Sequence, residues 1–216
     1  MLDLLCIAFA ALQRPPVDQA KVSYCEFTGA PDVPLATFNN APGTTHDWVA
    51  VNDPVMGGAS VSSLSVHDGV GAWVGEVKVV PSLGAPGFCT VRTKGDENVF
   101  PDCSTTKSLA LAVSYGSGLP TNAFAFEVGV QNVTSAQVVY HADFTDEFCC
   151  ADFCRVPWSA FKLSFRGKPV AGPPLTEHLH KITHIGIGTS GTAGKFEVDL
   201  LSFIGTNNSS QPCPPG

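Results

Sequence analysis

The chain has 216 residues, of which 44% are hydrophobic and 14% are charged, and its formal net charge is -7 at pH 7. This hydrophobic content suffices for a folded core and excludes a wholly disordered chain. The 12 Lys and Arg residues are too scattered to neutralise a nucleic-acid backbone, and no apolar run approaches the ~20 residues of a membrane-spanning helix. We therefore expect one domain, no nucleic-acid partner and no transmembrane segment in the mature chain.

The N-terminus predicts a signal peptide over residues 1–13. A short apolar run covers residues 4–12, and the two prolines that follow it end any helix. Asp3 stands where such leaders usually carry a basic residue, so a buried first strand is the alternative. Residues 14–47, rich in Pro, Asn and Thr, are expected to form an irregular segment that wraps the domain.

The middle of the chain predicts many short strands, because 21 Gly and 17 Pro would break long helices repeatedly. Alternating or β-branched runs separated by turn residues predict strands at residues 72–79, 88–93, 109–114, 124–130, 136–144, 154–157, 184–188 and 195–204. This number of strands favours an all-β, two-sheet sandwich of jelly-roll type over residues 48–205. Residues 206–216 form a polar C-terminal tail.

A compact motif precedes most of these strands, and it reads Trp48-Val49-Ala50-Val51-Asn52-Asp53-Pro54-Val55-Met56-Gly57-Gly58-Ala59-Ser60. Asn and Asp can hold a turn before a proline, and glycines allow close approach of two backbone segments. One interpretation is a structural knot in which Asp53 pairs with Arg92 while Trp48 closes one end of the sandwich. The other is a binding site, formed by Asn52, Asp53, Met56, Gly57, Gly58 and Arg92.

The motif resembles the hallmark of the complex I intermediate-associated protein 30 family, which has a Trp followed by Asn-Asp-x-Val-Met-Gly-Gly-x-Ser. The segments at residues 72–75 and 87–92 are also similar to the family's pattern, and weaker similarity extends to Ile204. The resemblance implies a galactose-binding-like jelly-roll β-sandwich, a fold shared with carbohydrate-binding modules. It also implies a role in the assembly of mitochondrial respiratory complex I, which the apolar leader and the many cysteines of this chain do not favour.

The cysteines and sequons favour the secretory pathway, with mitochondria as the alternative location. Seven cysteines would remain after removal of the leader, and the candidates for disulfides are Cys25, Cys89, Cys103, Cys149, Cys150, Cys154 and Cys213. Cys89 and Cys103 flank one turn and are the preferred pair. Acceptor sequences for N-glycosylation begin at Asn132, Asn207 and Asn208.

No cofactor, metal or catalytic residue is expected. The spacing of His178, His180 and His184 matches no known zinc motif, and cysteines 149, 150 and 154 are more readily oxidised in a secreted protein. The acidic loop at residues 94–98 lacks the spaced ligands of a calcium loop. A Gly-x-Ser-x-Gly elbow is absent from the sequence. The carboxylate pairs Asp143 with Asp146 and Glu197 with Asp199 could form a glycosidase pair, but the sequence does not fix the distance between their carboxyl groups.

The sequence therefore predicts a non-enzymatic binding domain that acts on a protein partner, as an assembly factor or in a chaperone-like role. The alternative is a secreted carbohydrate-binding module. The three tryptophans distinguish the two, because an exposed pair of rings on one sheet face would favour sugar, whereas buried rings would favour a protein partner. We expect Trp48, Trp73 and Trp158 to pack in the core.

Overall fold

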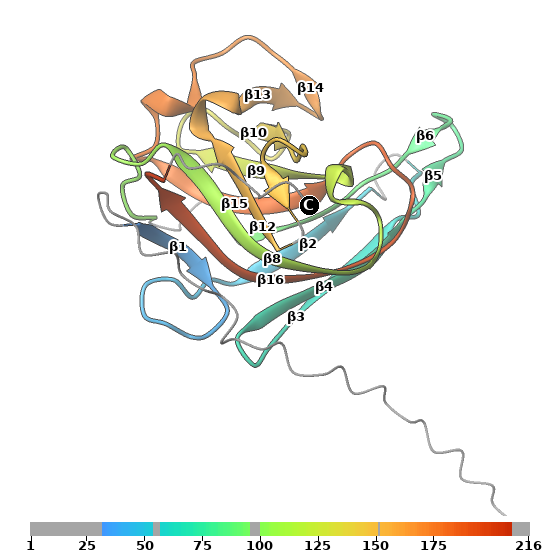
Figure 1. The fold of residues 1–216 in the computed structure, drawn as a ribbon. Coiled ribbons are helices and arrows are strands. Elements are labelled where there is room, and N and C mark those ends of the chain that lie inside the picture. The colour runs from blue at the N-terminus through green and yellow to red at the C-terminus, as the bar shows by residue number, and fades with distance from the viewer. Residues whose placement is uncertain (1–31, 54–56, 96–99, 151, 209–216) are drawn as a thin grey trace, which may run out of the picture.

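The computed structural model describes residues 32–53, 57–95, 100–150 and 152–208, and its regular structure there is almost entirely antiparallel β. Two seven-stranded sheets pack face to face, as Figure 1 shows. The helical elements in these ranges are single 3-10 turns, η3 (Thr121–Ala123), η4 (Trp158–Ala160) and η5 (Leu175–Glu177). No helix in the described part of the chain is long and apolar enough to cross a membrane.

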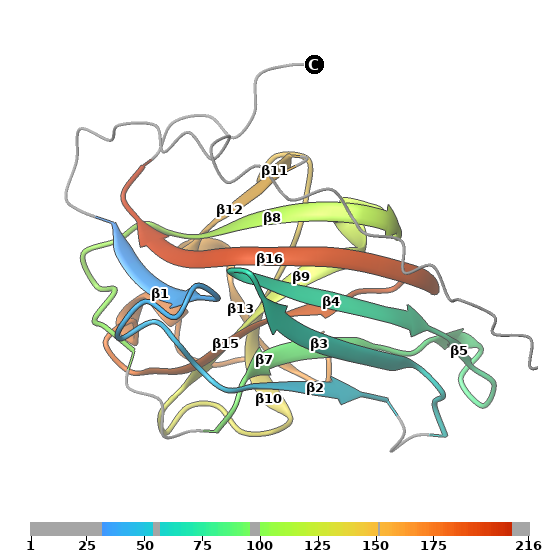
Figure 2. The same ribbon diagram turned by 90° about the horizontal axis from the view of Figure 1, so that it is seen from below.

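The first sheet has its longest strands at its centre (Figure 2). Its order is β11 (Cys149–Cys150), β12 (Phe153–Pro157), β8 (Ser108–Gly118), β16 (Gly194–Thr206), β4 (Val70–Val77) and β3 (Val61–His67). β1 (Val33–Thr37) pairs with the C-terminal part of β16. The N-terminal and C-terminal strands therefore lie side by side in one sheet.

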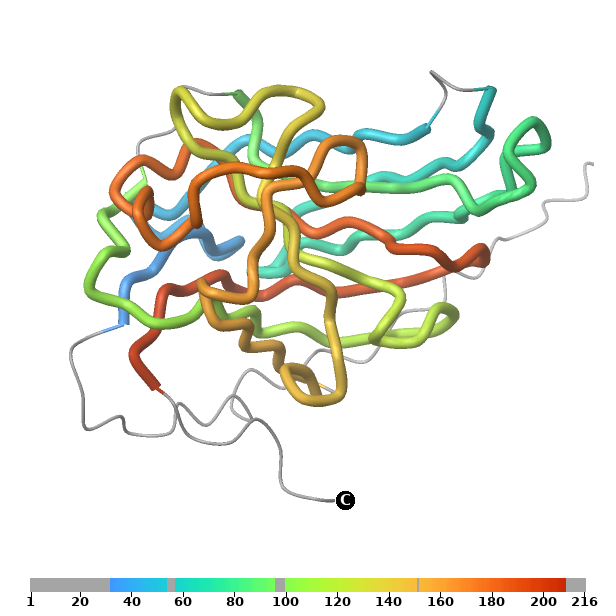
Figure 3. Tube along the Cα trace, turned by 90° about the horizontal axis from the view of Figure 1, so that it is seen from above, coloured from blue at the N-terminus to red at the C-terminus, as the bar shows by residue number. Residues whose placement is uncertain are grey.

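The second sheet carries the candidate site. Its order is β14 (Lys168–Pro169), β13 (Lys162–Phe165), β10 (Val138–Asp143), β9 (Phe124–Val130), β15 (Ile182–Thr189), β7 (Cys89–Thr93) and β2 (Trp48–Asn52). A separate hairpin of β5 (Val79–Val80) and β6 (Ala85–Pro86) projects beyond the ends of the other strands, as Figures 1 and 3 show.

Aromatic side chains fill the space between the two sheets. Trp73 packs against Phe196 with ring centroids 4.5 Å apart, and both rings contact Phe124. Trp73 and Trp158 are 0% and 1% exposed. Trp48 is half-buried and stacks on Phe38 at 5.1 Å. All three tryptophans thus pack within the protein as expected, which removes them as platforms for a sugar.

Each of the eight predicted strands overlaps an observed one, and β9 has the predicted bounds. The structure adds strands that the patterns did not indicate, among them β1, β2, β3 and β13. β1 falls inside the segment expected to be irregular, and its Leu35 and Ala36 are buried. That segment therefore supplies part of the sandwich, rather than only wrapping it.

The predicted bridge between Cys89 and Cys103 is wrong, because both are buried free thiols. Cys89 lies on β7 with its sulfur toward the carbonyl of Glu76, whereas the sulfur of Cys103 lies toward the carbonyl of Pro101. A disulfide instead joins Cys149 to Cys154, which are paired positions of β11 and β12. Cys150 is also disulfide-bonded. The predicted signal peptide, Cys25 and Cys213 lie outside the described residues.

The three sequons keep their status as predictions. Asn132 is exposed in the turn after β9 and has a left-handed backbone (φ 61°). Asn207 and Asn208 follow β16 and are half-buried. The hydroxyl of Thr134, which belongs to the first sequon, is hydrogen-bonded to the backbone of Val130.

Candidate functional site

A groove of about 610 Å³ opens on the outer face of the second sheet. On β9, Phe126 and Val128 belong to the core, and Glu127 between them lines the groove. The same alternation of side chains on the neighbouring strands turns polar residues outward. These residues are Thr90, Arg92, His141 and Ser164. The groove is within the size range of sites for small ligands.

The floor of the groove holds a polar cluster around Arg92 and Glu127. Both residues are paired with Gly186 of β15, so their side chains approach each other across a strand that has none at that position. Arg92 Nη1 lies 3.2 Å from His184 Nε2, and the hydroxyl of Thr90 donates to Glu127 Oε1 at 3.4 Å. Burial raises the pKa of Glu127, while the charge of Arg92 and the Thr90 hydrogen bond act in the opposite direction.

His141 faces Glu127 across the pairing of β10 with β9. Burial lowers the pKa of His141, and the carboxylate of Asp143, 4.0 Å from its Nδ1, partly opposes that shift. The imidazole is therefore mainly neutral at pH 7 and offers one donor and one acceptor. Together with Arg92 and Glu127 it gives the groove planar hydrogen-bonding groups of three kinds.

Glycines of β15 make room for these side chains. A Cβ at Gly186 would lie 2.6 Å from the Cβ of Arg92 and 2.5 Å from the carbonyl oxygen of Val91. A Cβ at Gly188 would lie 2.9 Å from Thr90 Oγ1 and 3.2 Å from Glu127 Oε1. Any side chain at either position would displace the polar cluster, so the absence of Cβ atoms here sets the depth of the groove.

The rim comes from loops at the ends of the strands. Its residues are Pro86, Gly87, Phe88, Ala136, Gln137, Arg166, Gly167, Ser190 and Gly191, with Val51 and Asn52 along β2. Phe88 is 39% exposed and is the phenyl ring of this lining. Phe88 was not among the residues predicted to contact a ligand, because only the three tryptophans were considered as aromatic platforms.

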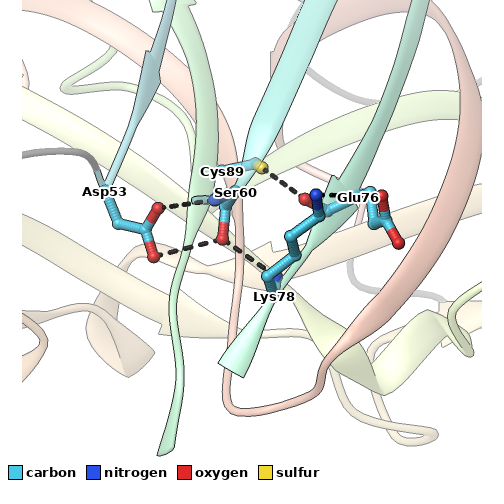
Figure 4. A network of polar contacts seen from close by, with 5 residues as sticks. All are labelled: Asp53, Ser60, Glu76, Lys78 and Cys89. Atoms are coloured by element: carbon cyan, nitrogen blue, oxygen red, sulfur yellow. Dashed lines mark hydrogen bonds and ion pairs between the residues drawn. The ribbon is translucent and has the colours of Figure 1, made fainter. Parts of the chain in front are cut away.

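Asp53 is the centre of a buried hydrogen-bond network at one end of the groove (Figure 4). Its carboxylate accepts hydrogen bonds from the backbone N–H and the hydroxyl of Ser60, at 3.0 and 3.1 Å. The Ser60 hydroxyl in turn accepts from the backbone N–H of Lys78 at 3.0 Å. These bonds tie the motif to the start of the β5–β6 hairpin.

Two glycines pack directly on this carboxylate. A Cβ at Gly58 would overlap the side chain and the carbonyl of Asp53, and a Cβ at Gly87 would overlap Asp53 Oδ2. The backbone N–H of Gly87 also donates to the carbonyl of Lys78 at 2.8 Å. The network therefore fixes the position of the rim segment that carries Phe88.

The structure brings together some of the predicted site residues. Asn52, Asp53 and Arg92 line the groove, whereas Gly58 packs behind Asp53 and Gly57 (φ 72°) forms a turn with open space around it. Met56 lies outside the described residues. Asn52 accepts a hydrogen bond from the Ser62 hydroxyl at 2.7 Å.

The predicted Asp53–Arg92 pair is wrong. Arg92 is paired with Val49 across β2 and β7, and Asp53 lies four residues beyond Val49. At about 3.4 Å per residue, this separates the two positions by roughly 14 Å along the strand. Arg92 has its hydrogen bond with His184, and Asp53 has its own with Ser60.

Within the described residues, the fold does not assemble a metal site or a glycosidase pair from the candidate His, Cys and carboxylate residues of the sequence. Cys149 and Cys154 form a disulfide, and His184 belongs to the groove cluster. Among the residues that the structure describes, no group of three or more His, Cys, Asp or Glu side chains could hold a metal ion. Glu197 and Asp199 lie on β16 in the other sheet. The acidic loop at residues 94–98 lies partly outside the described residues.

The family model described as complex I intermediate-associated protein 30 matches residues 36–200. The chain belongs to that family. The match includes the Asp53 network, the groove strands β7, β9, β10, β13 and β15, and most of the first sheet, so the groove is part of this chain's version of the complex I intermediate-associated protein 30 domain. No curated protein matches the chain by sequence.

Solved structures show the same fold at low sequence identity. A family 11 carbohydrate-binding module from Clostridium thermocellum, in complex with a β-1,3-1,4-mixed-linked tetrasaccharide, is 15% identical to this family member, with a TM-score of 0.52. The comparison covers 82% of this chain and 98% of that chain. A family 11 module of a Clostridium thermocellum cellulosomal cellulase is 13% identical, covers 83% and 97% of the two chains, and has a TM-score of 0.51. The fold is the galactose-binding-like jelly-roll β-sandwich that the resemblance implied.

Proposed function

We propose that this member of the family is a non-enzymatic domain that binds a carbohydrate in the groove of the second sheet. The observation that carries the proposal is the set of planar polar groups on the groove floor, a guanidinium, a carboxyl and an imidazole from Arg92, Glu127 and His141. Sugar hydroxyls both donate and accept, and planar groups with two polar atoms can bond to neighbouring hydroxyls at once. The open form of the groove suits a ligand that is long and hydrophilic.

The structural neighbours support this choice of ligand class. The family 11 module that aligns over most of this chain was solved with a bound tetrasaccharide. A volume of about 610 Å³ gives room for several sugar units. The packing of the tryptophans, with Trp73 and Trp158 buried and Trp48 half-buried, is the observation that speaks for a protein partner instead, and Phe88 on the rim is the observation that offsets it.

The arrangement of carboxyl groups supports binding without hydrolysis. Glycosidases use two carboxyl groups that flank the scissile bond. Of the two carboxyl groups that line the groove, Asp53 has both oxygens bonded to Ser60, and Glu127 is engaged by Thr90. Neither arrangement offers a paired acid and base.

A protein partner is the second candidate, in the assembly-factor or chaperone-like role that the sequence predicted for a member of the complex I intermediate-associated protein 30 family. The β5–β6 hairpin beside the groove exposes Val79 (52%) and Leu83 (56%), and exposed apolar side chains that project from a domain suit a protein contact. The disulfide between Cys149 and Cys154 supports an oxidising compartment. We therefore propose secretion for this chain, with mitochondria as the alternative.

A glycan array tests the proposal on the disulfide-intact protein. We expect binding of one or more neutral oligosaccharides, and a loss of at least about tenfold in affinity for Arg92→Ala and Glu127→Ala, since each removes groove hydrogen bonds. Leu83→Ala, on the hairpin outside the groove lining, is the matched control and should bind normally. No binding to any glycan, with capture of a protein that depends on Leu83, would favour the second candidate.

A further inference from the structure

We infer that Phe88 and the strand that directly follows it, β7, contact consecutive units of the ligand, with Phe88 as the ring platform at one end and Thr90 and Arg92 as the following subsites. The inference rests on the proposed function and specifies its ligand: a linear, neutral pyranose oligosaccharide of at least two units. It departs from the sequence analysis, in which Phe88 was not a candidate.

The alignment of these three side chains along the groove follows from the pleat of the strand. Thr90 and Arg92 are alternate residues of β7, Phe88 directly precedes the strand, and all three line the groove. Alternate residues of a strand project to the same face about 7 Å apart. A ligand that lies along β7 therefore meets a phenyl ring, then the Thr90 hydroxyl with Glu127, and then the guanidinium of Arg92.

Phe88 is held in place by its neighbours on both sides. The Asp53 network leaves no space for a side chain at position 87, and Gly87 N–H bonds to Lys78. On the other side, the backbone N–H of Cys89 donates to Thr189 Oγ1 at 2.9 Å, and the Thr189 hydroxyl donates to the carbonyl of Cys89 at 3.3 Å. A ring on a fixed backbone loses little conformational freedom when a ligand covers it.

The exposed phenyl ring selects for an apolar ligand face. A pyranose whose hydroxyl groups are equatorial presents its axial C–H bonds as such a face, and burial of apolar area against an aromatic ring is favourable. Phe88 supplies the phenyl ring of the rim, beside a floor that carries polar side chains. We place the first sugar ring on it.

The charges in the floor favour a neutral ligand. Arg92 lies beside Glu127, and the guanidinium lowers the pKa that burial would otherwise raise further. The guanidinium is thus bonded to His184 and lies one strand away from Glu127, so it does not require an anionic sugar. Hydroxyl groups of the second and third units can bond to Glu127 and Arg92 without displacing either side chain.

The test measures affinity against ligand length by calorimetry, with mixed-linked β-1,3-1,4-gluco-oligosaccharides of one to four units as the probe. Where the array selects another neutral glycan, its one- to four-unit forms replace them. For the wild type, we expect affinity to rise from one to three units. Phe88→Ala should weaken binding of the longest form at least about tenfold, and Phe88→Trp should retain it. Leu83→Ala, an exposed apolar side chain outside the groove, should leave affinity unchanged.

The outcomes separate the two proposals. A wild type that binds oligosaccharide while Phe88→Ala binds it equally well overturns the role of β7 and leaves the groove proposal standing. Binding that is already complete with a single sugar unit, or that requires an acidic sugar, also overturns the inference. Absence of binding to every glycan overturns the proposed function and the inference together. Phe88 is exposed, so its substitution should leave the melting temperature close to that of the wild type.

Discussion

Asp53 receives two hydrogen bonds from one residue, Ser60, through its backbone N–H and its hydroxyl. The pair closes the loop between β2 and β3 and leaves the carboxylate 2% exposed. The motif therefore forms a buried hydrogen-bond network at one end of the candidate groove, and its role as a binding site stays a prediction.

This network predicts the effect of Asp53→Ala. Removal of the carboxylate leaves the buried N–H and hydroxyl of Ser60 without that acceptor, which should lower the free energy of unfolding by about 2–4 kcal/mol. Urea unfolding measures this loss. Ser60→Ala should cost less, and the double variant should cost less than the sum because the two residues share their bonds. A near-native midpoint for Asp53→Ala would contradict a structural role of the network.

Glu127 predicts a dependence of stability on pH. Burial raises its pKa, so the folded protein keeps a proton that the unfolded chain releases above about pH 4.3. The stability contributed by this proton is present below that pH and is lost as pH rises through the pKa of the folded state. Glu127→Gln should therefore gain stability relative to wild type over the range of pH above about 4.3, as the wild-type carboxyl loses its proton.

Urea unfolding of both proteins across this range gives the slope. The slope is the readout because the substitution also removes the charge partner of Arg92 and changes the absolute stability. Parallel pH profiles for the two proteins would show that Glu127 titrates normally in the folded state.

The disulfide at the edge of the first sheet predicts a modest loss on its removal. Cys149 and Cys154 are five residues apart, and a bridge across so short a loop contributes about 2 kcal/mol by chain entropy. The double variant Cys149→Ser, Cys154→Ser should have a free energy of unfolding that is lower by that amount, and it should therefore unfold at a lower urea concentration. Glycan affinity should not change, since the groove lies on the second sheet. A matching loss of affinity would show that the bridge supports the groove.

We expect the two buried thiols, Cys89 and Cys103, to react slowly with alkylating reagents. Burial raises the pKa of Cys89 to about 11 and that of Cys103 to about 12, and the reactive form of a thiol is the thiolate. Neither should react with iodoacetamide in the native protein at about pH 8, and both should react in urea. Mass spectrometry of labelled peptides measures this. Rapid native labelling, or a peptide that links the two residues, would contradict the structure.

The sequence alone predicted the β-sandwich because alternation is strong where one face of a strand is wet. Residues 195–200 illustrate this, because Phe196, Val198 and Leu200 are buried and alternate with more exposed residues. β2 was missed because its five residues are all half-buried, which gives no alternation of exposure. β13 was missed because four residues are too few for a period to emerge.

The site was harder to predict because its parts come from strands distant in sequence. Arg92 and Glu127 meet only because Gly186 is paired with both, and no local pattern reports that register. The motif identified Asp53 as a buried charge but misassigned its partner, since Ser60 within the same motif supplies the hydrogen bonds. The preferred disulfide failed for a similar reason, because nearness in the chain does not show which way each sulfur points.

The alternation of β15 allows its two faces to change independently. Ile185 and Ile187 hold the core on one face, while Gly186 and Gly188 shape the groove on the other. At Gly188 the nearest obstacles to a larger residue are the side-chain oxygens of Thr90 and Glu127, which lie within the groove itself. Substitution there could alter ligand choice while the packing of the sandwich stays as it is. In this fold, recognition can therefore diversify between relatives without a matching change in thermal stability.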